Sequence, residues 1–224
     1  MTRSNNMTRK ISIVAFSLGI LVGVCGFDFG AVIGNIGGSG TWTSISKQWR
    51  QGLAGLTNAA VTMGVAQADI AEALGLKQQA ALLRTAARNL TSDGDSAGGA
   101  ALEEMGTRSL SVQKAINEKI KGSQKLTSQE KVALQKGGEV MMGALIKVGT
   151  NVFILVQASK AAASSGAPGL GDLTALPLVA DIPLLLPRAL ETIPKLYETA
   201  NDLFQYSAEK GIALPKPQAM PQFG

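Results

Sequence analysis

The sequence predicts an all-α protein, an antiparallel bundle of about five helices that follows an N-terminal signal segment and a Gly-rich linker. Apolar residues recur at three-, four- and seven-residue steps along most of the chain, and no segment alternates like a half-buried strand. Aromatic residues are only 4% of the chain and charged residues 17%, which suits close-packed helices rather than a disordered polymer. We expect a signal over residues 1–26, a linker over 27–42, a single helical-bundle domain over 43–214 and a loose tail over 215–224.

The longest predicted helix begins after Thr127 and continues to Ala163 without a proline. Thr127 and Glu130 have the spacing of a capping box, in which each residue's side chain binds the other's backbone N–H. On a helical wheel the apolar residues fall on one broad arc, and a narrow opposite stripe is polar. The arc holds Leu134, Met141, Met142, Leu145, Val148, Val152, Phe153, Leu155 and Val156, and the stripe holds Lys136, Glu139, Thr150 and Gln157.

A membrane span is the competing interpretation of this run, because few charges occur between Gly137 and Ala163. Lys147 lies near the centre of such a span, where a charge costs about 2.5–3.5 kcal/mol. Thr150 and Asn151 lie close to it. We therefore favour a helix that is buried in a bundle and keeps one solvated edge.

A helix predicted from Thr43 or Ser44 to Leu74 carries two neighbouring rows of residues with seven-residue spacing. One row holds Trp49, Leu56, Met63 and Ile70, and the other holds Ile45, Gly52, Ala59, Ala66 and Ala73. Because the second row is nearly all small, a partner helix can approach it closely. We favour a partner within the same chain, and a second subunit is the alternative.

Two shorter helices are expected between these long ones. Gly75 ends the first long helix, and apolar residues recur at helical spacing from Lys77 to Leu90. Another helix is predicted from Ala100 to Lys121, with Gly122 as the residue just beyond its C-terminus.

The last part of the predicted domain is rich in proline. Leu173–Leu186 is very apolar but contains Pro177 and Pro183, so we expect short turns over the bundle rather than one helix. The alternative is a flap that faces a membrane surface or a ligand. Pro187 fits the first position of a final helix that ends near Lys210.

The N-terminal segment has the layout of an export signal. Arg3, Arg9 and Lys10 precede an uncharged, mostly apolar run from Ile11 to Phe27. An uncleaved membrane anchor is the alternative, since about 17 residues is the lower limit for a span. The whole chain has a net charge of +5, and three of its positive charges lie in this segment. The chain from Cys25 onward therefore has a net charge of only +2. No basic stripe with aromatic platforms occurs, so nucleic acid is not an expected partner.

Cys25 is the chain's one cysteine, so an internal disulfide is excluded. It ends the run Leu21-Val22-Gly23-Val24-Cys25, which resembles the lipobox of bacterial lipoproteins. The resemblance implies that Cys25 is acylated and becomes the mature N-terminus. Val24 stands where that family has Gly, Ala or Ser. An ordinary signal-peptidase site, with Val24 and Gly26 in its specificity positions, is the alternative.

The residue types present restrict the possible chemistry. The chain contains no histidine, which excludes Ser-His-Asp triads and His-ligated zinc or haem. Two carboxylate pairs, Asp69 with Glu72 and Glu198 with Asp202, have helical spacing and are predicted to face solvent. We therefore predict no catalytic residue, no metal site and no cofactor.

The sequence thus favours an exported, non-catalytic protein of the bacterial envelope, in the periplasm or associated with the outer membrane. Its expected partners are the membrane, reached through the N-terminal segment or a lipid, and an envelope protein or a second copy of the chain. One alternative is a carrier or sensor of an apolar ligand, and another is a membrane-active protein. The residues that would line a ligand cavity, or simply fill the core, are Met63, Met105, Met141, Met142, Leu145 and Phe153. Core filling is favoured, and a cavity above about 300 Å³ would reverse that preference.

Overall fold

The computed structural model describes residues 42–92, 99–169 and 176–214, all within one compact unit, Ile36–Gly224. In these ranges the chain forms five α-helices and no strand, which confirms the all-α prediction for this part. The predicted signal, nearly all of the predicted linker and the predicted tail lie outside the described residues.

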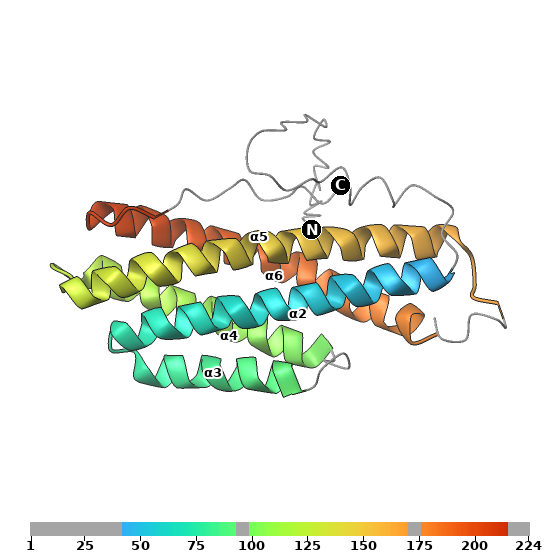
Figure 1. Ribbon diagram of the computed structural model, residues 1–224, viewed down its shortest axis with the longest axis horizontal. Coiled ribbons are helices and arrows are strands. Elements are labelled where there is room, and N and C mark those ends of the chain that lie inside the picture. Colours follow the sequence, from blue (N-terminus) through green and yellow to red (C-terminus); the bar gives the residue numbers. More distant parts are fainter. Residues whose placement is uncertain (1–41, 93–98, 170–175, 215–224) are drawn as a thin grey trace, which may run out of the picture. The chain divides into compact units, whose positions relative to one another are not determined.

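The helices lie side by side, as Figure 1 shows. They are α2 (Trp42–Ala73), α3 (Lys77–Ser92), α4 (Gly99–Gly122), α5 (Ser128–Ser164) and α6 (Leu176–Glu209). The most extensive contacts join α2 to α5, while α3 packs on α2 and α4, and α6 packs mainly on α4. The first four begin and end within one or two residues of their predicted bounds, as is usual for boundaries read from sequence.

Small residues allow α2 and α5 to pack closely. Gly52 of α2 faces Leu155, and Gly137 of α5 faces Ile70 near the other end of α2, so the two helices are antiparallel. A Cβ atom added at Gly137 would lie 2.5 Å from Ile70 Cγ1. The small row of α2 thus receives a helix of the same chain, as expected.

The start of α5 forms the predicted capping box. The Thr127 hydroxyl accepts a hydrogen bond from the Glu130 backbone N–H at 3.2 Å, and Glu130 Oε2 accepts one from the Thr127 backbone N–H at 2.6 Å. The hydrogen bond from the Thr127 backbone lowers the pKa of Glu130. Two N–H groups at the helix start are satisfied in this way.

The faces of α5 follow the helical wheel closely. Its predicted apolar arc is buried except for Phe153, which is half-buried. In the predicted polar stripe Lys136 and Glu139 are exposed, while Thr150 and Gln157 are half-buried. Of the helices in the described ranges, α5 alone has the length and composition to cross a membrane, and half of its most apolar stretch is buried inside the protein. That burial agrees with the preferred bundle helix.

The prediction of short turns before Pro187 was wrong, because α6 is continuous from Leu176 and contains Pro183, Pro187 and Pro194. These prolines are spaced by four and seven residues, so they fall within about 40° of one another around the helix. Pro183 and Pro187 are exposed and Pro194 is half-buried. Each proline lacks an N–H, so the carbonyl four residues before it loses its helical hydrogen bond. Because the prolines share one side of the helix, these carbonyls also lie on that side, where water can hydrate them and the helix can bend. Pro187 accordingly does not begin a helix.

Glycines mark two of the turns. Gly75, with φ of 81°, ends α2 as predicted, and Gly211, with φ of 71°, follows α6. The prediction for Gly122 was wrong, since this residue belongs to α4 and does not adopt a positive φ. The Ser123 backbone N–H instead binds the Lys119 carbonyl at 3.1 Å and extends the helical hydrogen bonding.

Candidate functional site

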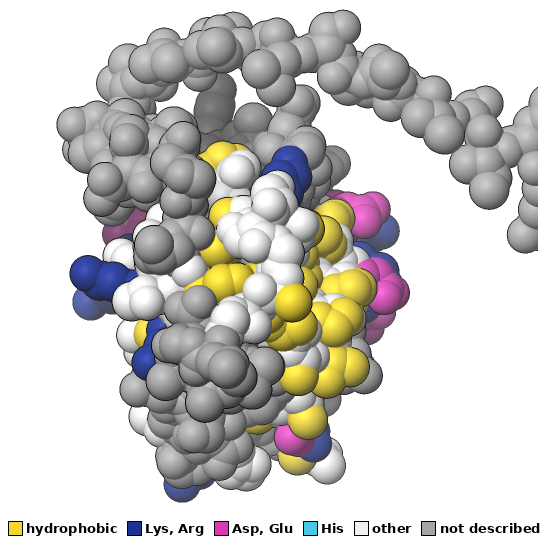
Figure 2. Space-filling view, turned by 90° about the vertical axis from the view of Figure 1, so that its right-hand side faces the viewer, with side chains coloured by type: hydrophobic (Ala, Val, Ile, Leu, Met, Phe, Trp, Pro, Cys, Tyr) yellow, Lys and Arg dark blue, Asp and Glu magenta, His cyan; other side chains and the backbone are white. Residues whose placement is uncertain are grey.

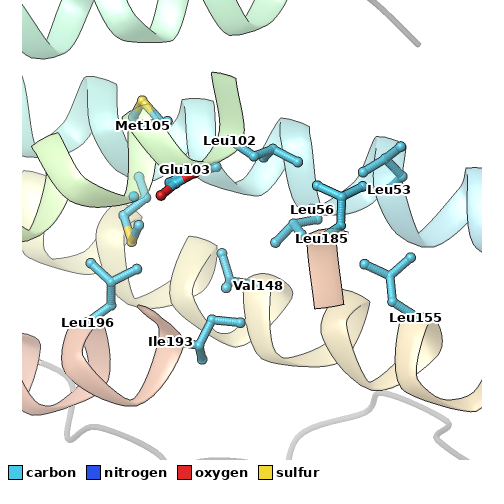
Figure 3. Close-up of a pocket in the computed structure, with 13 residues that line it drawn as sticks. Leu53, Leu56, Leu102, Glu103, Met105, Val148, Leu155, Leu185, Ile193 and Leu196 are labelled. Carbon is cyan, nitrogen blue, oxygen red and sulfur yellow. The ribbon is translucent and has the colours of Figure 1, made fainter. Parts of the chain in front are cut away.

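A small apolar cavity of about 70 Å³ lies between α2, α4, α5 and α6. Its wall combines leucines from all four helices with two methionines, Met63 and Met105, and the Glu103 side chain from α4 (Figure 3). Met105 also reaches α2, where the absent side chain of Gly64 leaves space for its Cε atom. The cavity is far smaller than the roughly 300–1,000 Å³ of typical ligand pockets.

The other residues named for a ligand cavity do not line this one. Met141, Met142 and Leu145 are buried in the hydrophobic core, at 1%, 3% and 0% exposure. Phe153 is half-buried and also lies outside the cavity wall. Of the six candidates, only Met63 and Met105 line this cavity, and Met141, Met142 and Leu145 belong to the hydrophobic core.

A chain of buried polar side chains crosses from α2 through α4 to α6. Gln67 Nε2 donates to Gln113 Oε1 at 2.9 Å, Gln113 Nε2 donates to Asn117 Oδ1 at 3.0 Å, and Asn117 Nδ2 donates to the Thr199 carbonyl at 2.9 Å. The Ser109 hydroxyl donates to Gln67 Oε1. Each of these residues is at most 7% exposed, so the hydrogen bonds fix how three helices pack.

The sequence interpretation missed this network, although a signal for it exists. Ser109, Gln113 and Asn117 recur every four residues beside the apolar edge of α4. Four-residue steps place them on one helix face, where they form a polar row next to buried residues. Gln67 interrupts an otherwise apolar and small stretch of α2 in the same way. Which rows face each other, however, depends on how the helices assemble.

Tyr197 makes a further buried hydrogen bond. Its hydroxyl donates to the Leu145 carbonyl at 3.1 Å and thereby joins α6 to α5. Burial raises the pKa of Tyr197 to about 12, because the phenolate would lose its hydration.

Several buried polar atoms in the described part of the chain have no hydrogen-bond partner. Trp42 Nε1, Ser46 Oγ and Trp49 Nε1 lie within the first two turns of α2, and Ser207 Oγ lies near the end of α6. A buried unpaired donor costs about 1–3 kcal/mol. Three of these four groups lie at the start of α2, so polar pairing is poorest there.

The acidic pair Asp69 and Glu72 is held by Arg84 of α3. Arg84 Nη2 lies 2.8 Å from Asp69 Oδ1 and 2.5 Å from Glu72 Oε2, and the hydrogen bonds to these two carboxylates raise the pKa of Arg84. Within the described ranges, no group of three or more Asp, Glu or Cys side chains is arranged to hold a metal ion. These carboxylates therefore act as an ion-paired clamp between α2 and α3.

Cys25, the candidate lipidation site, lies outside the described residues. No protein-family model, curated protein or solved structure matches the chain.

Proposed function

We propose that this chain is an exported protein of the bacterial cell envelope that binds another envelope component through its helical surface, with Cys25 as its site of lipid attachment. The observation that carries the proposal is the order of features in the sequence. A short basic segment, an apolar run and Cys25 precede a compact helical unit. Export signals and lipid anchors have this order.

Two features of the helical unit favour binding over catalysis. The buried polar side chains of the network form hydrogen bonds with one another and with a backbone carbonyl; they are Gln67, Gln113 and Asn117. Asp69 and Glu72 are exposed and engaged by Arg84. Catalytic groups are instead expected to converge in a cleft with their pKa values shifted apart.

Carriage of an apolar ligand is the less favoured alternative. A cavity of about 70 Å³ is less than half the 150 Å³ or so of an engineered cavity that accepts benzene. Met63 and Met105 could shift to enlarge it, since methionine adapts to irregular spaces. The volume as it stands suits a packing defect better than a binding pocket.

The test is fractionation of a bacterial host that expresses the full chain and is fed a fatty acid with a clickable tag. We expect the protein in the envelope fraction, shortened by its signal and carrying the tag. Cys25→Ser should abolish the tag. Val24→Ala, which supplies the small residue that the lipobox has at this position, should preserve or increase it. Full-length, untagged protein in the cytosol would overturn the proposal.

A further inference from the structure

The first half of α6 leaves apolar side chains in solvent. Leu184 is 61% exposed, the most of any large hydrophobic residue in the described ranges, and Val179 is 43% exposed. The neighbouring Leu185 is half-buried and lines the cavity beside Leu56. This segment is therefore apolar on both its inner and its outer side, whereas a helix of a soluble bundle keeps a polar outer face.

The same end of the protein carries positive charge on α2 and α5. In α2 no acidic residue precedes Asp69, and in α5 none follows Glu139. The charged residues of these stretches are Lys47, Arg50, Lys147 and Lys160. Because α2 and α5 are antiparallel, Lys47 and Lys160 lie at the same end of the pair. Lys47 and Arg50 form no ion pair with any described residue.

Two acidic side chains, one on α4 and one on α6, have basic partners four residues along the same helix. Glu104 pairs with Arg108 on α4 at 2.8 Å, and Glu191 pairs with Lys195 on α6 at 2.8 Å. Figure 2 looks onto this end and shows hydrophobic side chains gathered at its centre and right, with charged ones toward the edges. We call the surface made by Lys47, Arg50, Lys160, Val179 and Leu184 the open end.

We propose that the open end docks on an anionic lipid bilayer, with Val179 and Leu184 among the headgroups and Lys47 and Arg50 on the lipid phosphates. An apolar face flanked by cations is the combination that holds a helix at a membrane interface. The proposal rests on the proposed export and tethering, because only 16 residues, 26–41, separate Cys25 from the start of α2 at Trp42. A tether at Cys25 would thus join the membrane anchor to the helical unit at this end, where α2 begins.

The test places a fluorescent dye that reports its environment on one cysteine of the full chain. In a Cys25→Ser background, the dye is attached through Leu184→Cys or, as the matched control, Val140→Cys. Val140 is a 50% exposed hydrophobic residue of α5 beside Glu139 and away from the open end. Vesicles contain either phosphatidylcholine alone or equal parts of phosphatidylcholine and phosphatidylglycerol.

The dye at position 184 should shift to the blue on phosphatidylglycerol vesicles and much less on phosphatidylcholine, and high salt should weaken the shift. The dye at position 140 should stay in water. A double variant that carries both Lys47→Gln and Arg50→Gln should need about 10- to 30-fold more vesicles to reach half of the blue shift at position 184. Circular dichroism of each labelled variant checks that it is folded.

Two results would overturn this inference. In one, the protein binds the vesicles while the dye at 184 remains in water, so that only the N-terminal segment makes contact. In the other, both positions shift alike, or neither shifts because no vesicle binds. Export is measured separately by fractionation, so an exported protein whose position 184 stays in water would refute the docking alone. A cytosolic chain whose position 184 enters the bilayer would refute the proposed function alone.

Discussion

The two ends of α6 differ in how completely its leucines are buried. At the end where α2 stops and α5 starts, which we call the closed end, Gly137 lies against Ile70 and Leu203 is 0% exposed. The open end instead leaves Leu184 in solvent, and the buried Trp49 indole N–H nearby lacks a partner. The contrast indicates that the second half of α6, which carries Leu203, contributes more to stability than the first half, which carries Leu184.

The sequence of α6 explains much of this contrast. From Ile193 to Phe204 the buried residues recur at three- and four-residue steps, and polar residues such as Glu198 and Asn201 occupy the exposed positions between them. From Val179 to Leu190 nearly every residue is apolar, so the bundle can cover only one side. The alternation of apolar and polar positions thus gives a buried seam in one half of the helix, and the nearly continuous apolar sequence gives a surface patch in the other.

The largest expected effect comes from truncating one leucine in each half of α6. Leu203→Ala should lower the free energy of unfolding by about 2–5 kcal/mol, because it leaves a cavity in the core. Leu184→Ala should change it by less than about 0.5 kcal/mol, since the side chain is mostly in water. Urea unfolding followed by circular dichroism measures both values. Equal losses for the two variants would remove the distinction between the ends.

The next largest effect is expected in the polar network. Gln113→Ala removes the acceptor of Gln67 and the donor to Asn117, and both groups stay buried. We expect a loss of about 2–4 kcal/mol, because each stranded polar group costs about 1–3 kcal/mol. Gln135→Ala on the exposed side of α5 is the control and should stay within about 0.5 kcal/mol of the parent. A small loss for Gln113→Ala would mean that water replaces the missing amide.

A pair of glycines in α5 tests the close packing of the closed end. Gly137→Ala should destabilise the protein by about 1–3 kcal/mol, because its Cβ would press on the buried, β-branched Ile70. Gly143→Ala meets no atom within 4 Å and should stabilise the protein by about 0.5–1 kcal/mol through helix propensity. Thermal unfolding compares the two, and the same sign of shift in both would argue against a tight α2–α5 seam.

The smallest expected effect is a dependence on alkaline pH. Burial raises the pKa of Tyr197 to about 12 from an ordinary value of 10.0, so the folded state keeps the proton over a range where the unfolded state loses it. This contribution is complete below pH 10 and is lost as the pH rises toward 12, by about 1–2 kcal/mol. Tyr197→Phe should lower the stability at neutral pH by about 1 kcal/mol, through loss of the bond to Leu145. It should also flatten the alkaline decline.

The control for this measurement is Tyr206→Phe, at a half-buried tyrosine on the same helix. It should keep the alkaline decline of the parent, since Tyr197 is unchanged. Urea unfolding between pH 8 and pH 11 follows both variants. A decline of equal steepness in Tyr197→Phe and in the parent would exclude Tyr197 as its source.

Local signals predicted most of the fold. The Thr127–Glu130 capping box located the start of α5, and Gly75 located the end of α2, because both depend on neighbouring residues. The seven-residue rows of α2 predicted a close partner helix. The continuity of α6 was not predicted, since the rule that proline ends a helix does not consider whether several prolines share a solvent-facing side.

The sites were harder to predict than the helices. Gln67 and Gln113 are 46 positions apart in the chain, and only the packing of α2 on α4 makes them partners. The methionines gave no reliable sign of a cavity, because Met141 and Met142 fill the core while Met63 and Met105 flank a small void. Exposure of Leu184 likewise follows from the limited area that the other helices can cover.

Mass spectrometry of the chain purified from a bacterial envelope tests the central claim, export to the envelope, most directly. We predict a mature protein that has lost its basic and apolar leader, begins at Cys25 and carries the mass of an attached lipid there. An unmodified chain that still begins at Met1 and is recovered from the cytosol would contradict the account.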